Sequence, residues 1–419
     1  MAARGRSVIV FWYSRRDAML FERPALRRQR PKDSEVAKQI VFCADGTWNG
    51  PGDAASTTDI DGSAQNDAEL DGVTNVVKLF ANLMGQSTAE TQALQNETET
   101  MYRDGTGNLV QVAKYIHGVG DSKNPVMKVL GGVFGAGVIG RVIRGYTFIS
   151  RHYERGDSIH IVGFSRGAYT ARALAGMIAA VGLLDPRKYD PNDKREAYKR
   201  GFAAWLKCKG TVFKGSRKLS ALLNAIVEFA GDAVARVALR KSDLIPRVPM
   251  ESVAVWDTVG SMGIPNYVSG ARKDFFSFVD TKLSRAVAHG FHAMALDERR
   301  RDFPVTRWDR DARIEEVWFV GAHSDVGGGY PAAESGLSNI ALHWMTQKLS
   351  GVGVLFVTLP DETLDPKQFG QAFHTPWKKP PFNIGAEART PRAGDVFHPS
   401  VSRRWQTNAA YRKLWPKGF

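Results

Sequence analysis

The first candidate for chemistry is Ser165, at the centre of a Gly-x-Ser-x-Gly pentapeptide over residues 163–167. The apolar run at 159–162 precedes it, and an alanine-rich stretch at 168–181 follows with apolar residues at helical spacing. That order predicts a strand, a sharp turn and a helix, which together hold a serine hydroxyl beyond the sheet. Side chains at the two glycines would collide with the neighbouring strand and helix. We therefore predict that Ser165 is a nucleophile.

A serine nucleophile needs a base and an acid that orients the base. His323 follows an apolar run and begins a glycine-rich loop, which is where a base is expected. Asp257 follows the run at 251–256 and precedes another glycine-containing turn. Both come after the serine, in the order Ser, Asp, His of α/β-hydrolases. Asp325, two residues after His323, is the alternative acid or a residue that lines the site.

Two further histidines, His289 and His292, lie in a segment with a helix-like pattern and are expected to be structural or to line a cleft. An oxyanion hole requires backbone N–H groups aimed at the developing charge. One is expected from Arg166, the residue after the nucleophile, and others from Gly46 and Thr47, which follow the first apolar strand. The adjacent Asp45 is expected to line the site.

Neither a cofactor nor a metal ion is expected. The glycine-rich stretch at 131–140 is followed by neither Gly-Lys-Ser/Thr nor an acidic residue at the ribose distance, which argues against a nucleotide site. The two cysteines, Cys43 and Cys208, lack metal-ligand spacing, and Cys43 lies within an apolar run.

The elements around these residues alternate between strand and helix patterns. Strands are expected at 39–45, 111–116, 159–162, 251–256 and 316–320. Helices are expected after an N-cap at Thr74, at 142–153, at 168–181 and around 281–296. Polar or glycine-rich signatures follow the strands, as at the carboxyl edge of a parallel sheet. The fold class is therefore α/β: a mostly parallel, doubly wound sheet of the α/β-hydrolase type, with a helical lid or cap insertion.

The 419 residues are interpreted as a basic arm at 1–37 and an α/β-hydrolase domain at 38–419, with the cap or lid at 185–247. The first half of this insertion is basic and its second half apolar, which indicates a lid or membrane-contact element; a buried cap helix explains the apolar half equally well. The formal net charge of +14 favours an anionic partner. No transmembrane helix and no signal peptide are predicted.

Eight motifs in order resemble one family: FCADGTWNG, TNVVKLF, YIHGVG, GFSRGAYTARALAGMI, VAVWDTVGSMG, ALDERRRDFPVTRW, VWFVGAHSDVGGGY and HPSVSRRW. They are similar to the α/β-hydrolase domain family that includes the type VI secretion lipase effectors with phospholipase activity. The resemblance runs from about residue 38 to 415. It implies a triad of Ser165, Asp257 and His323, with the Asp45–Asn49 turn lining the site.

The resemblance also implies hydrolysis of acyl esters in glycerophospholipids of a membrane. It further implies synthesis in the cytoplasm, secretion into the periplasm of a target cell, and two protein partners: a secretion spike or delivery protein and an immunity protein. No nucleic-acid partner is expected. Two other functions stay open on the residues alone. One is a soluble carboxylesterase or thioesterase that does not act on membranes, and the other is a basic binding module with a vestigial hydrolase site.

Overall fold

The computed structural model describes residues 37–46, 72–87, 97–118, 132–212, 237–259, 281–301, 303–360, 365–378, 386–416 and 418. The chain divides into two units, Met1–Val36 and Ala37–Phe419. The arm predicted at 1–37 lies almost entirely outside the described residues. The following concerns the second unit.

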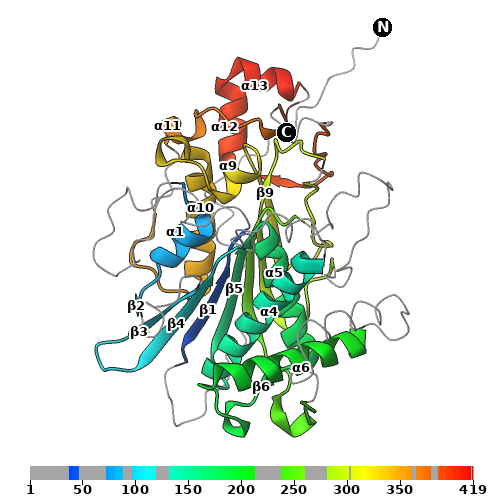
Figure 1. Ribbon diagram of the computed structural model, residues 1–419. Coiled ribbons are helices and arrows are strands. Elements are labelled where there is room, and N and C mark those ends of the chain that lie inside the picture. The colour runs from blue at the N-terminus through cyan, green and yellow to red at the C-terminus, as the bar shows by residue number, and fades with distance from the viewer. Residues whose placement is uncertain are drawn as a thin grey trace. The chain divides into compact units, whose positions relative to one another are not determined.

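The described residues form a nine-stranded sheet in the order β11-β10-β9-β8-β5-β1-β4-β3-β2. The strands from β11 to β4 run parallel to one another, and β3 and β2 add an antiparallel edge (Figure 1). Their bounds are β1 Gln39–Ala44, β2 Gln86–Ser87, β3 Glu97–Arg103, β4 Leu109–Ile116, β5 Ser158–Phe164, β8 Met250–Trp256, β9 Val287–Ala295, β10 Ile314–Phe319 and β11 Val396–Phe397. A mostly parallel sheet covered by helices on both faces confirms the predicted fold class.

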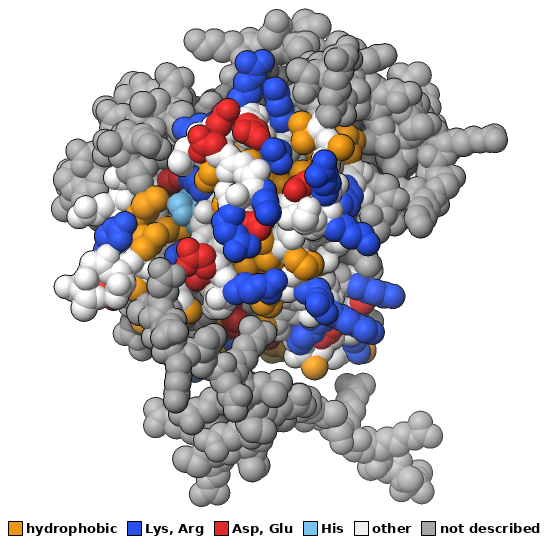
Figure 2. Space-filling view, turned by 90° about the horizontal axis from the view of Figure 1, so that it is seen from below, with side chains coloured by type: hydrophobic (Ala, Val, Ile, Leu, Met, Phe, Trp, Pro, Cys, Tyr) orange, Lys and Arg blue, Asp and Glu red, His pale blue; other side chains and the backbone are white. Residues whose placement is uncertain are grey.

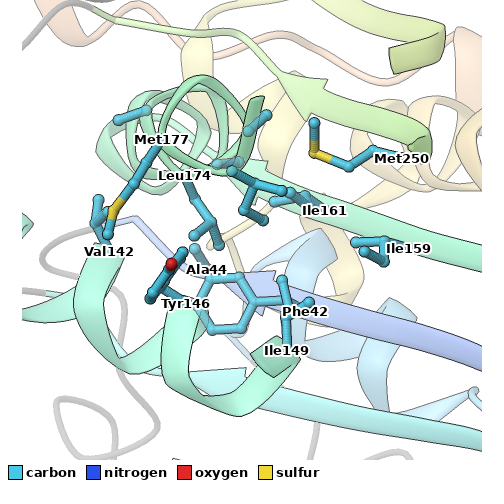
Figure 3. Packing of buried hydrophobic residues seen from close by; sticks show 14 of the residues in the cluster. Phe42, Ala44, Val142, Tyr146, Ile149, Ile159, Ile161, Leu174, Met177 and Met250 are labelled. Carbon is cyan, nitrogen blue, oxygen red and sulfur yellow. The ribbon is translucent and has the colours of Figure 1, made fainter. Parts of the chain in front are cut away.

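The central strand β1 shows how the sequence builds both faces of the sheet. Ile40, Phe42 and Ala44 enter one apolar cluster, and Val41 and Cys43 enter another on the opposite face. Because successive strand residues point to opposite faces, a strand between two helical layers is apolar throughout. Figure 3 shows the first cluster, in which Phe42 packs among side chains of α4 (Gly132–His152) and α5 (Arg166–Val181). The buried position of Cys43 agrees with its predicted role as a small apolar residue.

Helices α1 (Asn75–Ala81) and α10 (Gly336–Gly351) cover the second face. Thr74 caps α1 as predicted, because its hydroxyl oxygen accepts a hydrogen bond from the Val77 N–H. The short helix α9 (His323–Gly327) begins four residues after Phe319, the last residue of β10. No helix among the described residues is long and apolar enough to cross a bilayer.

The expected helix around 281–296 is wrong, because this segment holds strand β9. Its alanines favour a helix, but the strand pairs with β8 on one side and β10 on the other. Phe291, Ala293 and Ala295 enter the cluster beneath α10, while His292 and Met294 are buried on the opposite side. Tertiary pairing and burial on two faces therefore override local propensity.

Two other boundaries differ from the sequence pattern. Helix α4 begins at Gly132, ten residues before the predicted start, inside the glycine-rich stretch. Its buried residues Val138, Ile139, Val142 and Ile143 pack in the core, which offsets the roughly 1 kcal/mol that each glycine costs a helix. The polar stretch at 85–109, where no strand was predicted, contributes β2 and β3 at the sheet edge.

The described part of the predicted insertion forms a third helical layer. Helix α6 (Lys194–Val212) packs Phe202, Ala204 and Trp205 into the cluster of α4 and α5. The insertion begins next to β6 (Leu183–Leu184), which follows α5 and pairs with β7 (Leu244–Ile245). Because α5 has 16 residues, β6 lies about 24 Å along the helix from Ser165. Residues 213–236, which include most of the apolar half, lie outside the described residues, so the lid stays a prediction.

The exposed basic residues of this insertion therefore lie at the end of the sheet where the parallel strands begin. Arg187, Lys188, Lys194 and Arg195 are exposed there. The view from below in Figure 2 shows blue Lys and Arg side chains on this face, interspersed with acidic and apolar ones. Ser165 lies at the other ends of the strands, so these four residues do not surround the nucleophile.

The segment after α10, which has little sequence periodicity, is built into the domain. It contains α11 (Pro366–Phe369), β11, α12 (Pro399–Thr407) and α13 (Ala409–Leu414). Strand β11 extends the sheet next to β10, and Val401 and Tyr411 share an apolar cluster with Trp318 of β10. Figure 1 shows α12 and α13 above the same end of the sheet as α9. We call residues 365–419 the C-terminal segment.

Candidate active site

Ser165 sits on a sharp turn between β5 and α5. Its φ of 57° and ψ of −121° are strained for a residue with a side chain, and its N–H donates to the Trp256 carbonyl at 3.1 Å. A Cβ on Gly163 would lie 2.4 Å from the Gly167 carbonyl oxygen, and one on Gly167 would lie 2.1 Å from the Ala44 carbonyl oxygen. The expected collisions with helix and strand are therefore confirmed, and they explain why both positions are glycine.

The carboxyl ends of β5, β8 and β10 bring Ser165, Asp257 and His323 to one edge of the sheet. His323 Nδ1 lies 2.5 Å from Asp257 Oδ2, and both side chains are buried. The imidazole also packs on the ring of Phe164, the residue before the serine, with 4.6 Å between ring centroids. The hydrogen-bonded pair thus lies beside the turn that carries Ser165.

Asp257 has left-handed backbone geometry, with φ of 35°. Its Oδ1 accepts the Ala295 N–H at 3.0 Å, and its own N–H donates to the Ala293 carbonyl at 2.8 Å. Arg389 reaches the same carboxylate from the C-terminal segment, with Nη1 2.6 Å from Oδ1 and Nη2 3.0 Å from Oδ2. The carboxylate is therefore held by strand β9, the histidine and an arginine.

The charges of this pair follow from burial and from Arg389. Burial alone would raise the pKa of Asp257, but the Arg389 guanidinium and the His323 hydrogen bond outweigh it and hold that pKa well below its usual range. Burial lowers the pKa of His323 below its usual value, against the opposing effect of Asp257. A neutral imidazole beside a carboxylate is the state in which histidine can accept a proton.

Asp325 serves a different histidine. Its carboxylate accepts hydrogen bonds from the Ala322 N–H at 2.8 Å and from the N–H of His374 at 2.9 Å, and His374 Nδ1 lies 2.7 Å from it. His374 also contacts Glu334 through Nε2, at 2.8 Å. In this geometry the acid that contacts His323 is Asp257, and Asp325 joins α9 to the C-terminal segment.

The predicted oxyanion donors are placed only in part. Arg166 is the first residue of α5, where a backbone N–H has no acceptor within its own helix. Gly46 lies against the nucleophile, since an added Cβ would come 3.3 Å from Ser165 Cβ. Its N–H, however, donates to Asp45 Oδ1 at 2.6 Å, so a role in an oxyanion hole would require this amide to change its acceptor. Thr47 lies outside the described residues.

Asp45 is fully enclosed beside this turn. Its Oδ2 accepts hydrogen bonds from the Tyr115 hydroxyl at 2.6 Å and the Thr74 hydroxyl at 2.8 Å. Burial raises the pKa of Asp45 to about 6, although these hydrogen bonds oppose the shift. The carboxyl lies next to Gly46, whose Cα approaches the turn of Ser165.

The two other histidines lie outside the Asp257–His323 pair. His292 Nε2 accepts the Thr258 N–H at 3.1 Å, while its Nδ1 lies 3.0 Å from Glu316 Oε1. It thereby supports the turn after Asp257, which agrees with a structural role. His289 is partly exposed, 3.6 Å from Glu251. Among the residues that the structure describes, no group of three or more His, Cys, Asp or Glu side chains could hold a metal ion.

Sequence reasoning missed three residues at this edge: Arg389, His374 and Glu298. The Glu298 carboxylate accepts a hydrogen bond from the backbone N–H of His323 at 3.1 Å and forms an ion pair with Arg300. It lies in the ALDERRRDF motif, so that motif was the available signal. Arg389 and His374 lie in segments without periodicity or a recognisable motif, and nothing local indicates their partners.

Comparison with known families identifies the domain. Residues 38–348 match the model of the family described as T6SS, phospholipase effector Tle1-like, catalytic domain. The chain belongs to this family. The match includes the elements that carry Ser165, Asp257 and His323, and it ends before the C-terminal segment that carries Arg389.

Individual relatives of this Tle1-like chain are distant. It is 29% identical over 156 residues to the uncharacterized protein YEL023C of Saccharomyces cerevisiae, over 36% of the chain and 19% of that protein's length. It is similar to the Tle1 effector bound to the VgrG spike, at 18% identity and a TM-score of 0.36, over 72% of this chain and 53% of the other.

A thermophilic esterase from Thermogutta terrifontis shows 12% identity and a TM-score of 0.31, over 78% of this chain and 89% of that one. At these TM-scores, neither solved structure carries an argument about this chain.

Proposed function

We propose that this Tle1-like domain is a serine hydrolase that cleaves acyl ester bonds of glycerophospholipids, in the manner of a phospholipase A. The observation that carries the proposal is the Asp257–His323 hydrogen bond of 2.5 Å beside the strained turn of Ser165. These are the parts of a nucleophile, a base and an orienting acid in the α/β-hydrolase order.

In the proposed reaction, His323 Nε2 accepts the proton of the Ser165 hydroxyl as Oγ attacks the ester carbonyl. The Arg166 N–H donates to the oxyanion, and the lysophospholipid leaves as an alcohol after the imidazolium returns the proton to its oxygen. Water, deprotonated by the same histidine, then releases the fatty acid and restores Ser165. Asp257 stays ionised throughout and stabilises the imidazolium.

The family supports the proposed substrate class. The matched model describes catalytic domains of phospholipase effectors. Arg166 adds a cation next to the nucleophile; burial, reinforced by Arg141, lowers the pKa of its guanidinium to about 10, so it is charged at neutral pH. A lipid in a membrane is therefore the substrate we propose, rather than a small soluble ester.

The biological setting is also part of the proposal. An effector of this family is delivered by a type VI apparatus to a target cell, and we propose the periplasm as the site of action. A spike or delivery protein and an immunity protein are the partners to be sought.

Ser165→Ala tests the proposal. The variant is expected to lose hydrolysis of phospholipid vesicles and of short acyl esters, because no other described group at this edge replaces the serine oxygen. A fluorophosphonate probe should label the unaltered protein and not the variant, and circular dichroism should show an intact fold. Unchanged turnover by purified Ser165→Ala protein would contradict the serine mechanism. Activity on soluble esters without a gain at vesicles would contradict the membrane substrate.

A further inference from the structure

Arg389 makes four hydrogen bonds at the end of the sheet. Two go to the two oxygens of Asp257, as described above. The other two go to the carbonyls of Ala295, at the end of β9, and Phe303, both at 2.7 Å. The Arg389 side chain is only 7% exposed.

Each of these acceptors is connected to His323. Asp257 binds its Nδ1, and the Ala295 N–H fixes the other oxygen of the same carboxylate. The ring of Phe303 packs edge-on against the imidazole, with 5.1 Å between centroids. Arg389 thus joins the acid, the strand beside it and the loop that confines the histidine ring.

We propose that Arg389 is a positioning residue of the active site, which holds the Asp257 carboxylate against His323 Nδ1 and neutralises its buried charge. The inference rests on the proposed function, since it assigns a residue to that same reaction. It also means that one residue of the C-terminal segment, beyond the matched family region of 38–348, acts at the site.

The choice of arginine has a physical basis. A carboxylate with no exposed surface needs a partner, because removing an ion from water costs several kcal/mol. The planar guanidinium reaches both carboxylate oxygens and two carbonyls from one fixed group, which a lysine ammonium cannot do. The four hydrogen bonds of Arg389 go to Asp257, Ala295 and Phe303, and none of them goes to Ser165. Arg389 therefore acts through Asp257.

The charge of Arg389 also affects the base. The charged groups around the pair are His323 and Asp257 themselves, Arg389 from the C-terminal segment, Glu298 and Arg300 after β9, and buried His292 next to Thr258. A nearby cation disfavours the imidazolium, so removing Arg389 favours it. The pKa of His323 should then rise, and the acidic limb of the pH profile should move to higher pH.

The test compares Arg389→Gln and Arg389→Lys in the full chain, with rates expressed per fluorophosphonate-reactive site. For Arg389→Gln we expect kcat to fall on the order of 10- to 100-fold, part of the roughly 10⁴-fold that a disabled triad acid costs. KM should change little, and the acidic limb of kcat/KM should shift upward. Arg389→Lys keeps the charge and should keep the limb near its original place with an intermediate kcat.

Arg404→Gln is the matched control. Arg404 is another buried arginine of the C-terminal segment, and it donates to the carbonyls of Phe369 and Gln371 rather than to the triad. Arg404→Gln should lower the melting temperature or the fraction of molecules that react with the fluorophosphonate probe. It should leave kcat per reactive site and the pH profile unchanged.

The outcomes separate the two proposals. If the unaltered protein neither hydrolyses ester nor reacts with the probe, the proposed function fails. The unaltered protein can instead hydrolyse ester and react with the probe. If Arg389→Gln then has the same kcat per reactive site and the same acidic limb in its pH profile of kcat/KM, only the positioning role is overturned. Partial recovery of Arg389→Ala by millimolar guanidinium ion would support it further, since a purely structural loss is not restored by the missing cation.

Discussion

Ser165 and Asp257 both adopt positive φ, at 57° and 35°. Such geometry costs on the order of 1–3 kcal/mol per residue, and it persists only where the surrounding structure enforces it. At Ser165 the enforcement comes from the hydrogen bond to Trp256 and from the tight approach of β5, α5 and β1. At Asp257 it comes from β9, His323 and Arg389. At both positions the strain therefore accompanies the proposed chemical role.

The choice of acid is tested at the same scale. Asp257→Asn should lower kcat for ester hydrolysis by on the order of 10⁴-fold, because a neutral amide does not stabilise the imidazolium and can donate to Nδ1, which holds the imidazole in the wrong tautomer. Asp325→Asn, two residues from His323, should cost less than about tenfold, since that carboxylate serves His374 and the Ala322 N–H. Steady-state kinetics on folded proteins decide the point, and equal losses would contradict the assignment.

The elements that present the nucleophile touch through backbone atoms. Strand β5 lies between β1 and β8 in the sheet, and α5 leaves its end so closely that Gly167 approaches the Ala44 carbonyl. Helices α4 and α5 then seal one face of β1 and β5, as the side chains in Figure 3 illustrate. A side chain inserted at this junction must move a helix or a strand, because the core is closely packed.

Gly167→Ala tests that junction. A Cβ 2.1 Å from the Ala44 oxygen should lower the free energy of unfolding by about 1–3 kcal/mol and displace Ser165. Gly176→Ala in the same helix is the control, since a Cβ there meets nothing within 4 Å. It should stabilise the helix by about 0.5–1 kcal/mol. Urea unfolding measures both, and similar effects from the two substitutions would be inconsistent with the close approach.

On the scale of the whole domain, the C-terminal segment supplies partners to three buried carboxylates at the edge of the sheet that carries Ser165. Arg389 contacts Asp257, His374 contacts Asp325, and Tyr411 and Trp415 donate to Asp297 at 2.9 Å. Burial raises the pKa of Asp297, and these donors oppose that shift. The far end of the molecule, at β6 and α6, also carries exposed basic residues (Figure 2), as do α12 and α13.

Trp415→Phe measures what the last helix contributes. The substitution removes the indole N–H from a buried carboxylate and should lower the free energy of unfolding by about 1–3 kcal/mol. Leu414→Ala, at an exposed neighbouring position, should change it by less than about 0.5 kcal/mol. Chemical denaturation provides both numbers. An undiminished stability in Trp415→Phe would mean that Asp297 is satisfied without the Trp415 N–H.

Local sequence was sufficient for the parts of the site that consist of a strand end and the turn after it. The glycines around Ser165, and the apolar runs before Asp257 and before His323, predicted both the strands and the edge where they meet. The reason is that a parallel sheet places all its carboxyl ends together, so strand order along the chain is enough. The cap at Thr74 was readable for a similar reason, because a cap is a local hydrogen bond.

Only the tertiary structure decided which charged groups meet. From the sequence, Asp257 was the preferred acid and Asp325 the alternative; in the folded chain Asp325 contacts His374 and Asp257 contacts His323. Arg389 lies 132 residues from Asp257 in sequence, and no pattern around it predicts the contact. Strand β9 was misassigned because its buried neighbours on two sides, rather than its alanines, determine its conformation. Long-range pairing, burial and charge compensation depend on the folded chain as a whole, and no short stretch of sequence contains them.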